Sequence, residues 1–541
     1  MKKYYKISAI VTLLSSIACA NGLKDPLAAK VQEIHIGNFD NPKSLDPALC
    51  NEQVCDLILI QLFEGLVKEN NAGDIEPAAA EKWVISDDGK TYTFTLRNNL
   101  KWSDGSKLVA QDYVYAMKRL IDPKNASEFS NILESVVNGK GIISGQKNPK
   151  TLGVRALNDT TLEIKLAQPT SYFLQYMIMH QVFPMQKKSV EQHANKGSSF
   201  AVPGKLISNG PFILTSHKIG NKLTIEKNPN YWDKESVYLN KVHFYPIVDS
   251  NTEYKMYETG QLDITAGIPT GQYKILKNKH KNDFKSTPIL ANYYYIFNLS
   301  NEKLKSKNLR TALSIVLDRD VITQNILEGS QRSLYDFVPF GIKDYTQAKT
   351  YWQDYPREKQ LAEARKLYAE AGYSKENPFK INITYNTNDG HKKIATAIAS
   401  MWKKELGVLA NIQNEEWKSL LEKRINGDFE LVRYSYIADI NDPINFLIQF
   451  RTKELQNDAR YSNNEYDKLI NESMSEMDPV KRKNLLKLAG KIIIEDSPVI
   501  PIYSMTTSYL LKPSVVNLEK NMMLRFYLKN TYIREQGKAI N

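Results

Sequence analysis

The chain has 541 residues and a formal net charge of +12, and 42% of its residues are hydrophobic. This length corresponds to roughly three domain-sized units and is enough to bury a large core. An excess of positive charge can indicate nucleic-acid binding, but the basic residues are spread evenly and no run of five or more occurs. We therefore expect no nucleic-acid partner, and a solvated protein surface accounts better for the charge.

The first 20 residues have the pattern of a secretory signal peptide. Three lysines within residues 2–6 precede an apolar stretch over residues 7–17, and Ala-Cys-Ala at 18–20 forms a cleavage site. The apolar stretch is too short to span a bilayer. We expect cleavage before Asn21 and export to the periplasm as a soluble protein. The alternative is a lipoprotein anchored through Cys19, which is disfavoured because Ser16 and Ile17 stand where such a signal usually has Leu and a small residue.

Beyond the signal, Cys50 and Cys55 are the only cysteines. In an oxidising compartment such a pair favours a local disulfide. If both residues lay on one continuous helix, their separation would be awkward for a bridge, so two buried thiols are the alternative. The sequence leaves both possibilities open.

Strands and helices alternate along the chain. Apolar residues at every second position predict strands at Ile34–Ile36, Tyr92–Leu96, Leu162–Ile164, Leu223–Ile225 and Val242–Phe244. Apolar residues at helical spacing predict helices over Gln111–Leu120, over Glu358–Ala371 with Gly372 as the C-terminal cap, and after Asn388-Asp389 up to Leu406. Strands interleaved with helices indicate an α/β or mixed architecture, and no internal repeat is visible.

The segment 416–443 brings opposite charges close together. A helix is predicted from Trp417 to the Asn-Gly stop at 426–427, followed by a strand up to about Ile437. Arg424 lies on this helix, Arg433 lies on the strand, and Asp439 follows the strand before an Asn-Asp-Pro turn. A carboxylate after an apolar run is costly to bury without a partner, so Asp439 either caps a helix or binds a ligand. Cations and an anion placed in this way suit a ligand charged at both ends, such as a peptide.

Motifs of enzymes and metal sites are largely absent from the sequence. Neither a GxSxG nucleophile motif nor an HExxH zinc motif occurs. Gly89-Lys90-Thr91 resembles the end of a phosphate-binding loop, but Val84 replaces the required first glycine, so we interpret it as a hairpin turn. The seven histidines show no metal-ligand spacing. We expect neither catalytic activity nor a cofactor or metal.

An ordered series of motifs closely resembles the oligopeptide-binding proteins of bacterial ABC peptide importers, the family 5 extracellular solute-binding proteins. The series comprises SLDP at 44–47, LFEGL at 62–66, AEKW at 80–83, SDDGKTYTF at 86–94, LKWSDG at 100–105, SNGPF at 208–212, NPNYW at 228–232, YYY at 293–295, LDRD at 317–320, HKK at 391–393 and WKK at 402–404. Each motif alone is weak, but their order is specific, and the resemblance covers essentially everything after the first ~30 residues.

The resemblance implies an α/β, two-lobed periplasmic-binding-protein fold (type II, cluster C) with an extra subdomain inserted in the N-terminal lobe. Carried over to this chain, lobe I comprises residues 21–64, 189–290 and 507–541, with the signal peptide at 1–20. Subdomain II comprises residues 65–188, and lobe III comprises residues 291–506.

The resemblance also implies the ligand-binding residues. Asp439 would bind the α-ammonium group of a peptide. Arg433, Arg424 and His391 would meet the C-terminal carboxylate, each for a different peptide length. The pocket would be lined by Trp417, Phe129, Tyr294, Ser435, Tyr436 and Ile437, of which Ser435 and Ile437 would act mainly through their backbone groups. For the arginines the alternative is a solvated or internally paired charge, and for Trp417 it is a core residue of the helix.

The chain departs from the family at several positions. The usual disulfide that holds the Asp-bearing loop cannot form, because Ala291 and Ile437 occupy its two positions. Asn51 replaces an acidic residue of the N-terminal pocket, and Leu327 replaces a lysine that in some members meets the carboxylate of longer peptides. We therefore expect a peptide-length preference of its own.

The resemblance implies an exported, monomeric receptor that clamps short peptides between two lobes and delivers them to the membrane permease subunits of an ABC importer. The alternative on the same fold is a receptor for a specialised ligand, such as a murein peptide, a dipeptide, haem or a metal chelate. A secreted hydrolase is disfavoured because the catalytic motifs are missing.

Overall fold

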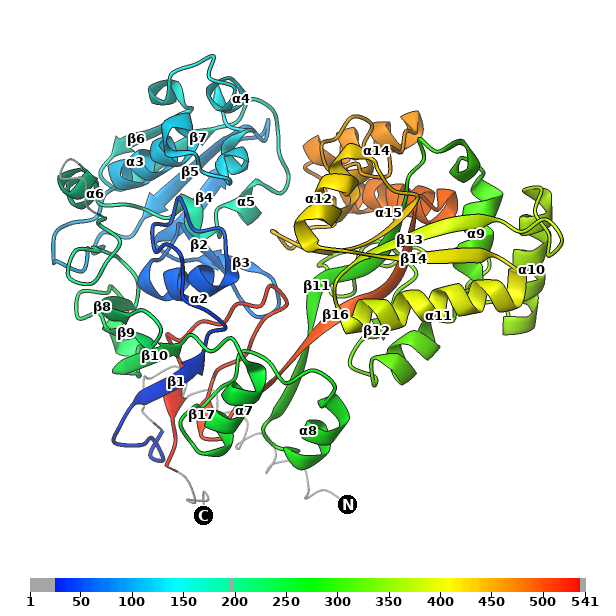
Figure 1. The fold of residues 1–541 in the computed structure, drawn as a ribbon. Helices are drawn as coiled ribbons and strands as arrows, with labels where there is room; N and C mark the ends of the chain where they lie inside the picture. The colour runs from blue at the N-terminus through cyan, green and yellow to red at the C-terminus, as the bar shows by residue number, and fades with distance from the viewer. Residues whose placement is uncertain (1–24, 195–198, 536–541) are drawn as a thin grey trace, which may run out of the picture.

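The computed structural model describes residues 25–194 and 199–535, so the predicted signal peptide and Cys19 lie outside the described residues. The chain folds into two α/β bodies joined by a long ribbon of two strands, as Figure 1 shows. None of the helices in the described ranges combines the length and apolar character needed to cross a membrane.

One sheet of the first body has the strand order β1-β10-β9-β8. Its strands are β1 (Glu33–Gly37), β10 (Lys241–Tyr245), β9 (Lys222–Lys227) and β8 (Phe212–Lys218). β1 and β10 are parallel, whereas the other neighbours are antiparallel. The alternating residues that predicted these strands, such as Ile34 and Val242, face the core and are fully buried. These strand predictions are confirmed.

A second antiparallel sheet has the order β4-β5-β7-β6, formed by β4 (Ala80–Ile85), β5 (Thr91–Leu96), β7 (Thr161–Lys165) and β6 (Val154–Asn158). Helix α3 (Ala110–Ile121) packs against this sheet through Tyr113, Val114, Met117 and Leu120, the predicted face. Gly89 adopts φ +67° in the turn between β4 and β5, a value that favours glycine. The interpretation of Gly89-Lys90-Thr91 as a hairpin turn is confirmed.

Shorter elements complete the first body. They are the hairpin β2 (Val67–Glu69) and β3 (Ile75–Pro77), the pair β17 (Val515–Val516) and β18 (Tyr532–Ile533), and the helices α2 (Gln53–Leu62), α4 (Gly139–Ile143), α5 (Phe173–Tyr176), α6 (Lys187–Ala194), α7 (Ser250–Glu258) and α8 (Tyr273–Lys279). The pair β17 and β18 brings the C-terminal segment back to the first body (Figure 1).

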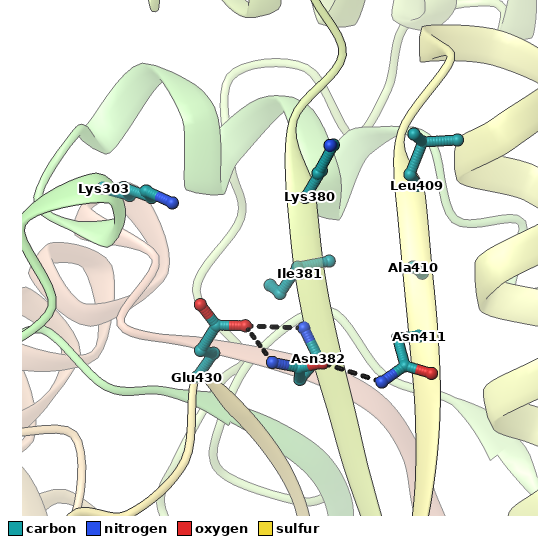
Figure 2. A pocket seen from close by; sticks show the side chains of 8 residues that line it. All are labelled: Lys303, Lys380, Ile381, Asn382, Leu409, Ala410, Asn411 and Glu430. Atoms are coloured by element: carbon teal, nitrogen blue, oxygen red, sulfur yellow. Dashed lines mark hydrogen bonds between the residues drawn. The ribbon is translucent and has the colours of Figure 1, made fainter.

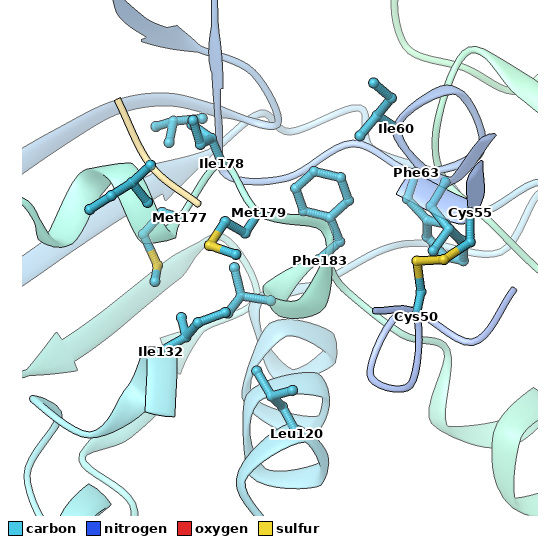
Figure 3. Packing of buried hydrophobic residues seen from close by; sticks show 14 of the residues in the cluster. Cys50, Cys55, Ile60, Phe63, Leu120, Ile132, Met177, Ile178, Met179 and Phe183 are labelled. Atoms are coloured by element: carbon cyan, nitrogen blue, oxygen red, sulfur yellow. A yellow bond between two sulfur atoms is a disulfide. The ribbon is translucent and has the colours of Figure 1, made fainter. Parts of the chain in front are cut away.

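Cys50 and Cys55 are joined by a disulfide in the structure, with their Cα atoms 6.0 Å apart. Cys50 lies in the loop before α2 and Cys55 lies in its first turn, so the two residues do not share one helix. Both are buried beside Phe63, Phe183 and neighbouring apolar side chains (Figure 3). The bridge therefore closes a short loop at the start of α2 inside the core of the first body.

The second body is built on a mixed sheet with the order β12-β16-β11-β15-β13-β14. Its strands are β12 (Arg332–Ser333), β16 (Val499–Leu510), β11 (Phe284–Phe297), β15 (Leu431–Ile437), β13 (Lys380–Asn386) and β14 (Leu409–Glu415). Its helices are α9 (Lys307–Ile315), α10 (Arg357–Glu370), α11 (Asp389–Leu406), α12 (Trp417–Asn426), α13 (Ile444–Leu447), α14 (Asn464–Ser475) and α15 (Pro479–Asp496).

The helix ends of the second body follow the signals in the sequence. The Asn388 side chain caps α11 by accepting from the backbone N–H of His391. Helix α12 ends at Gly427, whose φ is +80°. The helices predicted over 358–371, after 388–389 up to 406, and from 417 to the stop at 426–427 are confirmed, with observed bounds of 357–370, 389–406 and 417–426.

The ribbon of β11 and β16 connects the two bodies. Its lower half pairs Phe284 with Leu510, and its upper half pairs Ile296 with Val499. The register shifts between Pro288 and Asn292. The predicted boundaries at 290/291 and 506/507 both fall within this ribbon, where two strands form the main covalent passage between the bodies.

Candidate functional site

Strand β15 leaves part of one edge unpaired. On one side it pairs with β11 along its whole length, from Ile437 opposite Ala291 to Leu431 opposite Phe297. On the other side its pairing with β13 covers only Leu431 and Val432. Within the described residues, the backbone of 433–437 therefore has no strand partner on that side. Unpaired strand edges are templates for an added strand.

Asp439 lies just beyond the end of this strand. Its carboxylate is exposed to solvent and accepts a hydrogen bond from the Tyr436 hydroxyl at 3.2 Å. Its backbone N–H donates to the Asn445 side chain at 2.7 Å. The surrounding protein atoms raise the pKa of Asp439 by limiting its hydration, and the bonds from Tyr436 and Asn445 oppose this shift only in part. Asp439 caps no helix, so the alternative that this residue is a helix cap is wrong.

Arg433 lies near the opposite end of the open edge. Only 6% of the residue is exposed, and its guanidinium donates to Asn386 at 3.0 Å and to Ser435 at 3.2 Å. It also stacks 4.4 Å from the centre of the Tyr293 ring. Nε makes no hydrogen bond, and none of the ion pairs between described residues involves Arg433. A buried guanidinium without a carboxylate is costly unless a ligand supplies the negative charge.

His391 lies beside Arg433. Its Nδ1 is 3.2 Å from the Tyr293 hydroxyl, and the two rings are in contact. Burial lowers the pKa of His391 to about 4, and the charge of Arg433 contributes to the shift. His391 is therefore neutral near pH 7 and offers a hydrogen bond, with the positive charge supplied by Arg433.

Arg424 is held elsewhere. Its guanidinium forms an ion pair of 2.6 Å with the buried Asp458 and lies 3.9 Å from the centre of the Tyr434 ring. Tyr434 and Arg433 alternate along β15 and so point to opposite faces of the sheet. The structure therefore brings Arg433 and His391 together but not Arg424, which has the internally paired arrangement given above as the alternative.

Trp417 is not a core residue of its helix. It is 42% exposed, and its ring lies parallel to that of Tyr434 with the centroids 6.3 Å apart. An exposed indole on a rigid helix offers a flat apolar surface to a ligand.

The remaining predicted pocket residues differ in accessibility. Ile437 is 54% exposed, whereas Tyr294 is 2% exposed and packs edge-on against Phe337. Ser435 and Tyr436 are half-buried on β15. Phe129 is also half-buried, but it belongs to the first body, where it precedes a short 3₁₀ turn.

Ala291 and Ile437 are direct partners in the β11–β15 pair, so a disulfide at these positions would tie the end of β15 to β11. In this chain the same junction is held by a backbone hydrogen bond from Ala438 to Leu290 of 2.8 Å. Of the other two departures, Asn51 is exposed and Leu327 is half-buried.

Tyr176 on α5 is a site residue that the sequence did not single out. Burial raises the pKa of its phenol, and the carboxylate of Asp439 adds to this shift, as it also does at Tyr436. The charge of Asp439 in the second body thus acts on an aromatic hydroxyl of the first. The sequence carries no signal for this, because Tyr176 is one of 31 tyrosines.

A surface concavity lies apart from these residues. It is lined by Lys303, Lys380, Ile381, Asn382, Leu409, Ala410, Asn411 and Glu430. Figure 2 shows Glu430 bonded to Asn382 beside the first residues of β13 and β14. None of the predicted ligand-binding residues contributes to it.

Comparisons with known proteins agree over nearly the whole chain. Residues 74–458 match the model of the bacterial extracellular solute-binding proteins, family 5. The periplasmic murein peptide-binding protein MppA of Escherichia coli is 36% identical over 519 residues, which cover 95% of this chain and 96% of MppA. The periplasmic oligopeptide-binding protein OppA of Haemophilus influenzae is 34% identical, covering 93% of this chain and 94% of OppA.

Solved structures of both relatives superpose on this chain. The unliganded open form of MppA gives a TM-score of 0.85 at 35% identity, covering 94% of this chain and 99% of that structure. The structure of OppA of Haemophilus influenzae in complex with the peptide RPPGFSPFR gives a TM-score of 0.75 at 34% identity. The match covers 94% of this chain and 100% of that structure. The predicted α/β, two-lobed fold is confirmed.

Proposed function

The chain belongs to family 5 of the bacterial extracellular solute-binding proteins, and we propose that it captures short peptides between its two lobes for delivery to an ABC importer. The observation that carries this proposal is the open edge of β15, with the buried, unpaired cation of Arg433 near one end and the carboxylate of Asp439 beyond the other. An extended peptide would add a strand to this edge through backbone hydrogen bonds, which do not depend on its side chains.

The spacing of the two charges favours tri- and tetrapeptides. Arg433 and Asp439 are six residues apart, which is about 20 Å in an extended chain at ~3.3 Å per residue. The Arg433 guanidinium reaches along the strand towards Asp439 as far as the Ser435 hydroxyl, to which it donates, and the two ionic contacts shorten the span further. The remaining ~10–13 Å matches three or four extended residues. In this arrangement Asp439 binds the ammonium group, and Arg433 with His391 binds the carboxylate.

Two further observations support capture by closure. Besides burial, the charge of Asp439 in the second body raises the pKa of Tyr176 in the first, so the first body lies near the proposed ammonium site and closure of the lobes would bury the N-terminal end of the ligand. The TM-score is higher with the unliganded open form of MppA than with the peptide complex of OppA, which is consistent with an open receptor. Hinge closure around a ligand is a common transition of two-lobed binding proteins, and the β11–β16 ribbon is the element that would bend.

The proposed setting follows the family. Its members are solute-binding receptors, and we assign no catalytic step to this chain. MppA of Escherichia coli and OppA of Haemophilus influenzae are periplasmic by name. We therefore place this protein in the periplasm, after cleavage of the signal peptide. It would act there as a monomer on the permease subunits of its importer.

A murein tripeptide is the second candidate ligand, because MppA is 36% identical over nearly the whole chain. Such a ligand also carries an ammonium group and carboxylates, so Asp439 and Arg433 fit both candidates. The side-chain surroundings, including exposed Trp417 and Ile437, would then decide between them.

Native mass spectrometry and calorimetry test these proposals. The purified mature protein is measured before and after mild denaturation, then refolded without ligand and titrated with free tripeptides and with murein tripeptide. Co-purified mixed peptides and micromolar binding of several unrelated tripeptides would support the general receptor. Strong preference for murein tripeptide would support the second candidate. An empty protein that binds neither class would overturn both.

A further inference from the structure

A compact group of metal-ligand side chains lies on the polar face of the β1-β10-β9-β8 sheet. His35 of β1 and His243 of β10 are direct neighbours in the parallel pair, and Glu33 precedes His35 by two residues on the same face. One ligand atom from each of the three side chains lies within 4.8 Å of the others. The Nε2 of His243 is 3.5 Å from a Glu33 carboxylate oxygen. None of these residues belongs to the proposed peptide site.

Both imidazoles are oriented by hydroxyl groups. Nδ1 of His35 is 2.9 Å from the Tyr245 hydroxyl, and Nδ1 of His243 is 3.0 Å from the Thr224 hydroxyl. When each Nδ1–H donates to its hydroxyl, the lone pair of each ring is at Nε2. Metal-binding histidines commonly use such a hydrogen bond to fix the tautomer and the ring orientation.

The two rings are stacked with their centroids 4.9 Å apart and an interplanar angle of 25°. Two stacked imidazoles beside a carboxylate offer two nitrogens and one oxygen to a cation.

We propose that Glu33, His35 and His243 form a binding site for a divalent transition-metal ion such as Zn²⁺. Two histidines and one carboxylate are a known zinc ligand set, with a water completing four-coordination. Ligand atoms about 2.0–2.1 Å from a tetrahedral ion are roughly 3.3 Å apart. The ligand atoms, which lie within 4.8 Å of one another, therefore need to close by up to about 1.5 Å. Small rotations of the half-buried Glu33 and His35 side chains towards the buried His243 would supply this.

The charges around the site limit its affinity. Asp263 and Glu33 contribute negative charge near His35, whereas Lys222 and Lys512 contribute positive charge. Lys512 is paired with Asp263 at 3.0 Å, so Lys222 is the main cation that opposes binding. Its removal should tighten metal binding without touching a ligand atom.

The experiment is a Zn²⁺ titration of the mature protein, produced without a polyhistidine tag and stripped with a chelator, in competition with a chromogenic chelator. We expect one Zn²⁺ per chain. His35→Asn and His243→Asn should each weaken binding at least about tenfold, and Glu33→Gln should weaken it less. Lys222→Gln should tighten it. Co²⁺ replaces Zn²⁺ in a second titration, where a visible d–d absorption reports four-coordination.

The matched control is His217→Gln. His217 is on β8 of the same sheet, and the structure shows no acidic group bonded to it, so its replacement should leave Zn²⁺ affinity unchanged. Circular dichroism and retained peptide binding show that each variant is folded. A wild-type protein without a stoichiometric site would overturn the proposal, as would His35→Asn and His243→Asn variants that bind as tightly as wild type. None of these positions contacts the peptide site. If the wild-type protein binds Zn²⁺ but no peptide, the proposed function fails and the metal-site proposal stands.

Discussion

Replacement of Asp439 by asparagine should separate the charge of this residue from its shape. Asparagine has nearly the same size, and its side-chain oxygen can still accept the hydrogen bond from Tyr436 that spans 3.2 Å in the wild type. The variant therefore removes the negative charge that would meet the ammonium group of a peptide and leaves the end of β15 in place.

The expected loss follows from the surroundings of the carboxylate. A charge-assisted hydrogen bond contributes about 1.5–3 kcal/mol. Asp439 is exposed, but the surrounding protein atoms limit its hydration and raise its pKa, and the proposed closure of the lobes would exclude more water. We therefore expect about 2 kcal/mol, which is roughly a 30-fold weaker Kd. The folded protein should be at least as stable as wild type at pH 7, since a carboxylate with a raised pKa is a cost to folding when ionised.

The assay is isothermal titration calorimetry with a free tripeptide and with its N-acetylated form. The free peptide should lose affinity for Asp439→Asn, whereas the acetylated peptide, which lacks the ammonium group, should bind wild type and variant equally weakly. Glu358→Gln is the charge-matched control, because this acid is exposed on α10 at the periphery of the second body (Figure 1). Binding of the free peptide by Asp439→Asn within twofold of wild type would refute the assignment.

Three further predictions concern the three residues that were expected to meet the peptide carboxylate. Arg433→Met should weaken binding of free tripeptides by about 3 kcal/mol, roughly 100-fold or more, but should leave C-amidated peptides unaffected; equal losses for both would refute its role. Arg424→Met should lower the free energy of unfolding by about 3 kcal/mol in urea titrations, because it leaves Asp458 buried and unpaired, and Asp458→Asn in the same chain should restore it. His391→Gln should gain melting temperature relative to wild type as the pH falls from 6.5 to about 4. The folded protein keeps His391 neutral with a pKa of about 4, so wild type loses stability where the unfolded histidine takes up a proton. If the melting temperatures of wild type and His391→Gln fall in parallel over this pH range, the prediction is wrong.

Local patterns predicted the secondary structure well for a physical reason. The period-2 and period-3.6 patterns record which side of an element is buried, so Ile34, Val242 and the α3 face could be assigned without tertiary information. The stop at Asn426-Gly427 was also predictable, because a left-handed residue after the last turn favours glycine. The pairing of strands was not predictable in this way, since β11 and β16 meet over a separation of about 200 residues.

The candidate site was predictable only in part. The resemblance to the family predicted Asp439 and Arg433 as ligand-binding residues, but two features of the candidate site required coordinates. The open edge of β15 depends on where β13 diverges from it. The partner of Arg424 is Asp458, which no spacing rule connects to it. Outside this site, the pairing of the distant strands β1 and β10 brings His35 and His243 together, which their linear spacing does not indicate.

The loop that carries Asp439 is held by hydrogen bonds to both bodies. Four residues beyond position 437, the Asn441 side chain donates to the buried Glu69 of the first body at 3.4 Å and accepts from the backbone N–H of Lys343 at 3.2 Å. Glu69 also accepts from Asn521 at 3.1 Å, and burial raises the pKa of Glu69. These contacts connect the loop to both bodies, whereas a disulfide between positions 291 and 437 would connect it to β11 alone. The position of Asp439 should therefore depend on the relative arrangement of the two lobes, so that binding of the peptide ammonium group and lobe closure reinforce each other.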